Sequence, residues 1–334
     1  MKNLILTGCA GFIGFNFLKH ALASGVAEEY DNVYSIDKLG YAAFYNIKEY
    51  EELCDANNIH CVSMPIANLA DGYVFTFDSD EEKVDVLNFA SESHVDRSID
   101  SPSSIFMENA AIPSQLIDAI GVDRINKWIQ ISTDEVYGEL PLDTESSKWF
   151  KVGDNFHPNN PYSASKAAQD MYLLSMEHTF NLNLQFIRLA NQFGPHQHPE
   201  KMLPATIIRA FKGESIKIYG TGDNIRQWTP VTHSVKVIYD QLMNDSVETV
   251  FIAKMYVPLL TNNEIVEAWR SELLNQYNVT TEIEYIEDRK GHDTMYALQT
   301  TEEVDAVFLE TTLEQEFAAT IKFYHDNLER YIES

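Results

Sequence analysis

The chain has 334 residues with 45% hydrophobic and 12% aromatic side chains, enough to bury the core of one large domain or two smaller ones. Its net charge of −27 argues against nucleic acid or an anionic membrane as a partner. Three cysteines without a CxxC pair argue against a disulfide framework, and no apolar stretch approaches the roughly 18 residues of a membrane span. The apolar start of the chain fits a buried strand better than a signal peptide, so we expect a cytoplasmic protein.

The first 192 residues alternate between predicted strands and predicted helices. The strands are expected at Leu4–Leu6, Val33–Ile36, His60–Met64, Val84–Phe89, Lys127–Ser132 and Leu184–Leu189. The helices are expected at Gly11–Ser24, 46–57, 103–120 and 161–179. This alternation predicts an α/β fold with a parallel, doubly wound sheet of the Rossmann type.

The alternation breaks in the second part of the chain. Phe193–Pro204 is rich in His, Pro and Gly and predicts a binding loop, followed by a helix near 203–212 and a strand at Ser215–Tyr219. A helical apolar stripe typical of core packing is formed near the end by Phe317, Ile321, Tyr324 and Leu328. We therefore expect residues 1–192 to bind a dinucleotide. Residues 193–334 are expected to form mainly a smaller C-terminal substrate-binding lobe, with some segments returning to the first domain.

The segment Thr7–Gly14 carries three glycines between the first predicted strand and the first predicted helix. Gly8 permits a tight turn, Gly11 lets the backbone approach a pyrophosphate, and Gly14 allows the helix to pack closely on the strand. The N–H groups of the helix N-terminus would then meet the phosphates. A purely structural turn is the alternative.

Asp37 ends the second predicted strand, where a carboxylate accepts hydrogen bonds from the adenosine ribose of a dinucleotide. No arginine follows it directly to take the 2′-phosphate of NADP, so the sequence favours NAD. Lys38 leaves NADP open.

Tyr162 and Lys166 are four residues apart and share one face of a predicted helix. A lysine ammonium beside the phenol would lower the pKa of the tyrosine, so that Tyr162 could act as a base towards a sugar hydroxyl. A Tyr-x-x-x-Lys pair is weak evidence for hydride chemistry at a hydroxyl when it occurs alone. It becomes strong evidence when it follows a glycine turn and a fifth predicted strand.

Asp134 and Glu135 follow Thr133 at the end of the fifth predicted strand, where a turn can direct both carboxylates at one ligand. Adjacent carboxylates raise each other's proton affinity, which suits one as an acid and the other as a base. An acidic turn that only caps the next segment is the alternative.

His94 follows the fourth predicted strand at the edge where ligands bind, and a capping or loop histidine is the alternative there. Other histidines show no trusted metal-ligand spacing, so no metal site is expected.

These motifs together resemble the extended short-chain dehydrogenases and, among them, the dTDP-glucose 4,6-dehydratases. The resemblance spans nearly the whole chain through Thr7–Gly14, Ile36–Leu39, Glu92–Ile99, Ser132–Gly138, Tyr162–Lys166, Asn191–Pro195, Pro199–Lys201, Gly220–Trp228 and Asp288–Asp293. Its most specific element is the Thr-Asp-Glu triplet, because related epimerases and decarboxylases usually lack the Asp-Glu pair.

The resemblance implies a tightly held NAD and a three-step conversion of a nucleotide-bound glucose. Tyr162 would take the proton of the 4-hydroxyl, steadied by Thr133, while hydride leaves C4 for the cofactor. Glu135 would then remove the C5 proton as Asp134 protonates the departing 6-hydroxyl. Hydride would return to C6 and give a 4-keto-6-deoxy sugar.

The resemblance also implies the binding residues and a homodimer built from the helices near 103–120 and 161–179. NAD would be held by Gly8, Gly11, Phe12, Ile13, Gly14, Asp37, Lys38, Ile66, Ala90, Tyr162, Lys166 and Gln192. The sugar nucleotide would be held by Ser93, His94, Asn191, Glu200, Lys201, Tyr219, Arg226, Asn262, Arg289 and His292. The cations among them would form a locally positive groove in an acidic protein.

Several positions depart from the family pattern, namely Pro65, Glu108, Gln192, Gln227, Thr229-Pro230 and Thr294-Met295. These changes leave the catalytic residues intact. They alter positions that the family uses to contact the adenine of the cofactor and to select the base of the substrate nucleotide. UDP-glucose is therefore the nearest alternative substrate. A 4-epimerase is less favoured, since it has no use for Asp134 and Glu135, and a non-catalytic NAD-binding protein is the remaining alternative.

Overall fold

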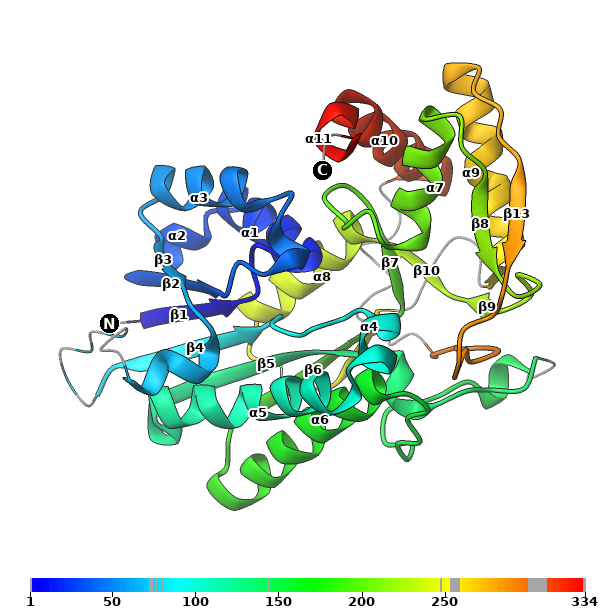
Figure 1. The fold of residues 1–334 in the computed structure, drawn as a ribbon. Helices are drawn as coiled ribbons and strands as arrows, with labels where there is room; N and C mark the ends of the chain where they lie inside the picture. Colours follow the sequence, from blue (N-terminus) through cyan, green and yellow to red (C-terminus); the bar gives the residue numbers. More distant parts are fainter. Residues whose placement is uncertain are drawn as a thin grey trace.

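A parallel seven-stranded sheet forms the centre of the protein (Figure 1), in a computed structural model that describes residues 2–332 except 72–74, 76, 78, 80, 143–144, 247, 253–258 and 300–310. The strands are β1 (Lys2–Thr7), β2 (Asn32–Asp37), β3 (His60–Ser63), β4 (Lys83–Asn88), β5 (Ile125–Thr133), β6 (Leu184–Leu189) and β11 (Val250–Ile252). Their order is β11-β6-β5-β4-β1-β2-β3, and every neighbouring pair is parallel. The predicted doubly wound sheet is confirmed. The order reverses beside β1, and ligands bind at the carboxyl edge of such a switch point.

Helices cover both faces of this sheet, as Figure 1 shows. One face carries α1 (Phe12–Ala23), α3 (Ile47–Ala56) and α8 (Val231–Met243), and the other carries α5 (Pro102–Ile120) and α6 (Pro161–Phe180). Leu4 and Leu6 of β1 face the first group and Ile5 faces the second, the alternation expected of a strand buried on both sides. Pro113 lies inside α5 without ending it.

The short helices of this region are α2 (Val26–Glu29) and α4 (Val95–Asp100). Short 3₁₀ helices occur at η1 (Tyr41–Ala43), η2 (Ile66–Asp71), η3 (Val122–Arg124), η4 (Asp134–Tyr137) and η5 (Ser146–Lys148).

The second part of the chain packs around its own apolar cluster, which includes Phe193, Trp269, Phe317 and Tyr324. Its helices are α7 (Met202–Phe211), α9 (Asn262–Tyr277), α10 (Leu313–Asp326) and α11 (Leu328–Ile332). Its short strands pair as β7 (Asn191–Phe193) with β10 (Trp228–Pro230), β9 (Ile225–Arg226) with β12 (Leu260–Thr261), and β8 (Ile216–Tyr219) with β13 (Ile283–Ile286). The predicted helix near 203–212 and strand at 215–219 are found, whereas the predicted C-terminal stripe divides at Asn327 into two helices.

The two parts of the chain are not separate in sequence, because α8 and β11 lie after residue 192 yet pack on α1 and β6. The predicted boundary at residue 192 stays a prediction.

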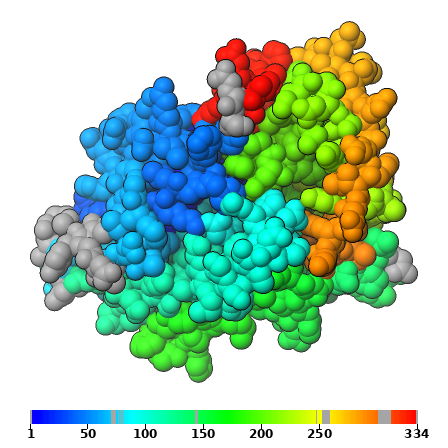
Figure 2. All heavy atoms as spheres, viewed as in Figure 1, coloured from blue at the N-terminus to red at the C-terminus, as the bar shows by residue number. Residues whose placement is uncertain are grey.

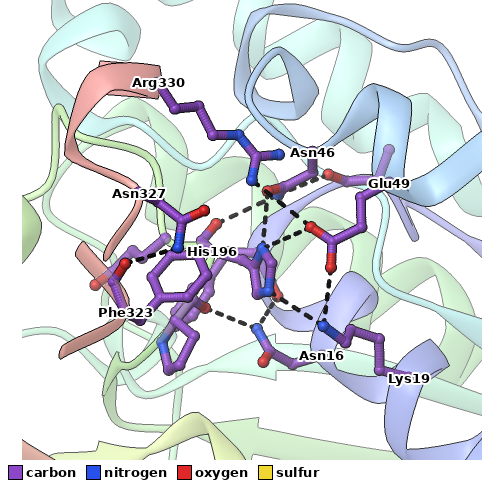
Figure 3. A network of polar contacts seen from close by, with 12 residues as sticks. Asn16, Lys19, Asn46, Glu49, His196, Phe323, Asn327 and Arg330 are labelled. Carbon is purple, nitrogen blue, oxygen red and sulfur yellow. Dashed lines mark hydrogen bonds and ion pairs between the residues drawn. The ribbon is translucent and has the colours of Figure 1, made fainter. Parts of the chain in front are cut away.

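A polar network ties the loop after β7 to α1 and α3, and joins α3 to α11 (Figure 3). The buried His196 carries its Nδ1 3.3 Å from Asn46 Oδ1 and 3.9 Å from Glu49 Oε2, both on or at the start of α3. Asn46 Nδ2 donates to Ala10 O in the glycine turn at 3.1 Å and to His196 O at 3.3 Å. Arg330 of α11 reaches the same Glu49 at 3.6 Å. The loop that leads to residues 197–201 is therefore held against the glycine turn.

Candidate active site

A cavity of about 780 Å³ opens at the carboxyl edge of the sheet, a volume typical of small-molecule sites. In the space-filling view, the N-terminal segment (blue), the segment around α4 (cyan) and α7 (green) meet on one face (Figure 2), and all three contribute to the cavity lining. Every site residue predicted from the sequence lines this cavity. The structure therefore brings the whole predicted set together, although lining alone does not assign a role to any member.

Two glycines of the turn, Gly8 and Gly14, have no room for a side chain. Gly8 adopts a φ of +71°, and a Cβ there would lie 2.8 Å from Ala90 N. A Cβ on Gly14 would lie 2.4 Å from Gly8 O, so α1 could not approach β1 as closely. No side chain caps the N-terminus of α1, where Phe12 and Ile13 line the cavity. Its first-turn N–H groups are therefore suited to an anion such as a pyrophosphate.

Asp37 is fixed at the end of β2 by two backbone donors. Its Oδ2 accepts from Ala10 N at 3.0 Å and its Oδ1 accepts from Leu39 N at 2.8 Å. Burial raises the pKa of this carboxyl group. The carboxylate is thus oriented beside the glycine turn, as expected of a group that binds a ribose.

The two adjacent carboxyl groups begin η4 directly after β5. Thr133 Oγ1 donates to Asp134 Oδ1 at 3.1 Å and accepts from Glu135 N at 3.3 Å, so the threonine fixes the start of the turn. Asp134 is 2% exposed, and its Oδ2 has no hydrogen-bond partner in the described part of the chain. Burial, reinforced by Glu135, raises the pKa of Asp134 to about 7. Asp134 can therefore carry a proton near neutral pH, as predicted for the acid of the pair.

Glu135 is held by donors from the start of α6. Its Oε2 accepts from Ser163 Oγ at 2.9 Å and from Asn160 Nδ2 at 3.2 Å. Asn160 also caps α6 through Ser163 N at 2.9 Å, which fixes both donors. The carboxylate is therefore oriented into the same cavity as Asp134.

Lys166 is bound away from the phenol of Tyr162. Its Nζ donates to Ile131 O at 2.8 Å and to Gln169 Oε1 at 2.7 Å, and burial lowers its pKa to about 8. The pKa of Tyr162 is raised, first by burial and then by the charges of Glu135 and Asp134. The prediction that Lys166 lowers the pKa of Tyr162 is wrong for this arrangement, because burial and the two carboxylates raise that pKa, while the ammonium binds Gln169 and Ile131 O.

The sequence reasoning missed three residues that hold the candidate site in place, namely Gln169, which binds Lys166, and Asn160 and Ser163, which bind Glu135. Gln169 belongs to a buried chain of amides in which its Oε1 also accepts from Gln130 Nε2 at 3.1 Å. Its place three residues after Lys166, on the same helix face, is the signal that could have identified it.

A second group of charged side chains lines the part of the cavity formed by the second half of the chain. Lys201 Nζ donates to Ser93 O at 2.9 Å, and Arg289 Nη1 lies 3.7 Å from Asp96 Oδ1. Arg226 Nη2 donates to Asp293 O at 2.8 Å while its guanidinium stacks 4.4 Å from the ring centre of Tyr296.

The cavity lining as a whole is balanced in charge. It holds seven Lys or Arg side chains and seven Asp or Glu side chains, in a protein of net charge −27. Three of these cations lie close together, since the charge of Arg289 adds to burial in lowering the pKa of both Lys201 and Arg226. A positive groove is therefore limited to this region.

His94 lines the cavity and also caps α4. Its Nδ1 accepts from Arg97 N at 3.3 Å, and its Nε2 lies 3.7 Å from Glu200 Oε2. Burial lowers its pKa to about 4, so the imidazole is neutral near pH 7. The capping alternative and the cavity position are thus both observed.

No group of His, Cys, Asp or Glu suited to a metal ion occurs among the described residues. Within the same residues, no helix has the length and apolar character that a bilayer span requires.

The chain is similar to known proteins over nearly its whole length, which confirms the resemblance seen in the motifs. Residues 4–252 match the NAD dependent epimerase/dehydratase family. The low-salt glycan biosynthesis protein Agl12 of Haloferax volcanii is 36% identical over 305 residues, which cover 90% of each chain. A dTDP-glucose 4,6-dehydratase of Xanthomonas campestris pv. campestris is 33% identical over 348 residues, covering 98% of this chain and 94% of that one. The crystal structure of DesIV, a dTDP-glucose 4,6-dehydratase of Streptomyces venezuelae solved with NAD bound, has a TM-score of 0.83 at 28% identity and covers 97% of both chains.

Proposed function

The chain belongs to the NAD-dependent epimerase/dehydratase family, and we propose that it is a 4,6-dehydratase of a nucleoside-diphosphate glucose, with dTDP-glucose as its substrate. The observation that carries this proposal is the pair Asp134 and Glu135 beside Tyr162 in one cavity. Elimination of water needs a proton donor and a proton acceptor at neighbouring atoms, and this pair supplies one of each.

NAD is the cofactor, and the residues present fit it. The uncapped N-terminus of α1 suits the pyrophosphate, and the oriented carboxylate of Asp37 suits the ribose of the adenosine. When bound, NAD supplies the acceptor and donor of hydride and a positive charge that favours the ionised form of a nearby tyrosine.

Tyr162 acts as the base at the sugar 4-hydroxyl in this proposal, and Thr133 holds that hydroxyl. Tyr162 is fixed on the first turn of α6, and the side chain of Thr133 opposes the rise in its pKa. Lys166, held by Gln169 and Ile131, keeps a positive charge next to the site while pH stays below its pKa of about 8.

Glu135 removes the proton from C5 in the elimination step, once a ketone at C4 has made it acidic. Asp134 gives its proton to the departing 6-hydroxyl, which leaves as water. The roles follow the surroundings of each group, since Asp134 is buried with an unpartnered oxygen and Glu135 accepts two hydrogen bonds. Once the hydride taken from C4 has returned to C6 and C5 has received a proton by way of Glu135, the product is a 4-keto-6-deoxy sugar that remains attached to its nucleotide.

The diphosphate of the substrate binds to cations from the second part of the chain. Lys201, Arg226 and Arg289 come from three separate segments and line the same region. Guanidinium groups suit phosphate oxygens because they offer several donors in one plane. Asn191, Glu200, Tyr219, Asn262 and His292 line this region too and complete the proposed substrate contacts.

We further propose a homodimer formed through α5 and α6 in the cytoplasm. Exposed apolar side chains on these two helices include Met107, Met171, Leu174 and Phe180, and Met107 and Met171 are each more than half exposed. Apolar surface of this kind marks candidate contact faces. The free thiols of Cys9, Cys54 and Cys61 support a reducing compartment.

The test is to incubate the purified protein and NAD with dTDP-glucose and, in parallel, with UDP-glucose. Loss of one water from dTDP-glucose, followed by mass spectrometry, is the expected result. Faster loss of water from UDP-glucose would instead identify UDP-glucose as the substrate. Conversion to an isomer of unchanged mass would indicate a 4-epimerase, and NAD binding without turnover of either sugar would indicate a non-catalytic protein.

A further inference from the structure

Lys38 stands where a cation would meet the extra phosphate of NADP. A dinucleotide site of this type binds the ribose 2′-hydroxyl at the acid that ends the second strand, and a neighbouring cation accommodates a 2′-phosphate. Asp37 is that acid, and Lys38 directly follows it and lines the cavity. From sequence alone, Lys38 was therefore a potential partner for NADP.

The ammonium group of Lys38 is occupied in the structure by two carboxylates. Its Nζ contacts Oε1 of Glu92 and Oε1 of Glu108, and both glutamates line the cavity. The three side chains come from the end of β2, the segment after β4 and the middle of α5. The lysine thus reaches away from its own strand to a pair of acids on other elements.

The position of these acids is fixed by the next residue of α5. Asn109 is fully buried, accepts from Glu92 N through its Oδ1 at 2.8 Å and donates to Glu92 O through its Nδ2 at 3.0 Å. Its Nδ2 also donates to Ser165 Oγ of α6 at 2.9 Å. The buried Asn109 therefore fixes the backbone of Glu92 against α5, beside the position of Glu108.

The charges around the ribose position leave an excess of acid. Asp37, Glu92 and Glu108 contribute three carboxylates against the single ammonium of Lys38. A 2′-phosphate brings up to two further negative charges, whereas NAD carries only a hydroxyl there. The same surroundings therefore oppose NADP through repulsion and through the loss of its natural counter-ion.

We propose that Glu92 and Glu108 make this site selective for NAD over NADP, by holding Lys38 and by repelling a 2′-phosphate. The two acids are specificity-determining residues, and Glu108 is the one that departs from the family pattern. The inference rests on the proposed use of a dinucleotide and concerns only which of the two is admitted.

The experiment compares the binding of NAD and NADP by isothermal titration calorimetry, on the full chain freed of co-purified nucleotide. Glu108→Gln keeps the size of the side chain and removes its charge, which frees Lys38 to form a charge-assisted hydrogen bond. The ratio of Kd for NADP to Kd for NAD is expected to fall about tenfold, the gain from one such bond. Asp118→Asn on the exposed face of α5 removes the same charge away from the cavity and should leave the ratio unchanged.

A second variant separates the two parts of the inference. In Lys38→Met combined with Glu108→Gln, most of the gain for NADP should disappear, because its proposed partner is gone. A ratio in Glu108→Gln that stays within about twofold of wild type would overturn the inference. A gain that persists in full without Lys38 would overturn the role given to that lysine.

These outcomes are distinct from a failure of the proposed function. Wild-type protein that binds NAD and dehydrates dTDP-glucose, yet shows no change of ratio in Glu108→Gln, refutes only the selectivity device. Wild-type protein that binds neither dinucleotide refutes the proposed function itself.

Discussion

The two ends of the cavity use charge in different ways. At the catalytic end, Asp134 and Lys166 are deeply buried, and burial moves the pKa of both groups towards neutrality. At the cationic end, Arg289 lies 3.7 Å from Asp96 and Lys201 is bonded to the carbonyl of Ser93. The first arrangement suits proton transfer and the second suits binding of a diphosphate. The difference implies that changes at the catalytic end affect kcat, whereas changes at the cationic end affect KM.

Replacement of Glu135 by Gln should have the largest effect. The amide keeps the shape of the side chain but cannot take the C5 proton, so kcat for water loss should fall about 10³-fold with little change in KM. Steady-state kinetics on dTDP-glucose measure both constants. Glu145→Gln, an exposed acid outside the cavity, is the matched control and should behave as wild type. A variant that still releases the full product at the wild-type rate would remove Glu135 from the proposed chemistry.

The second largest effect should be the pH dependence of kcat, which reports the protonation of Asp134. Its pKa is raised to about 7, so the acid form is abundant below pH 7 and is lost as pH rises. We expect kcat to fall about tenfold per pH unit above pH 7, or about a hundredfold at pH 9. Asp134→Asn should be slow throughout and lose the fall between pH 7 and pH 8, which lies below the pKa of Lys166. A wild-type profile that stays flat from pH 7 to 9 would contradict the role of Asp134 as the acid.

A substitution at the cationic end should change KM and leave kcat almost unchanged. Arg289→Gln removes a positive charge from the partly exposed region near Asp96. The KM for dTDP-glucose should rise about tenfold while kcat stays close to wild type, as expected for the loss of one charge-assisted contact to phosphate. An unchanged KM with a reduced kcat would break the proposed division between the two ends.

The exposed surface of α6 lies outside both ends of the cavity, so a substitution there should change neither kcat nor KM. Met171 is 58% exposed and lies on the proposed dimer face. Met171→Glu should convert the dimer to a monomer, measured by light scattering after size-exclusion chromatography, with kcat altered by less than about twofold. A wild-type protein that is already monomeric would refute the proposed dimer but would leave the proposed function of the cavity unaffected.

The sequence correctly indicated that the residues of the proposed catalytic end lie together, because its signals are local. The glycine turn, the Thr133–Glu135 triplet and the Tyr162–Lys166 pair each lie within a few residues of one another. Local spacing could not predict the bond from Lys166 to Ile131 O, because that carbonyl belongs to β5, 35 residues earlier in the chain.

The second part of the chain was predicted less completely, for physical reasons. Helix α8 contains Val231, Thr232, Val235, Val237 and Ile238, whose β-branched side chains favour strands. Packing of its buried face against α1 outweighs that preference. Strand β13 pairs with β8 from more than sixty residues away, so no local pattern could reveal it.

The most direct test of the central claim is the elimination step in deuterated water. The wild-type protein is incubated with NAD and dTDP-glucose, and the product is examined by mass spectrometry and proton NMR. The account predicts loss of one water with a solvent deuteron at C5, and neither in Glu135→Gln. Water loss that leaves the original C5 proton in place, or a labelled product from Glu135→Gln at the wild-type rate, would contradict it.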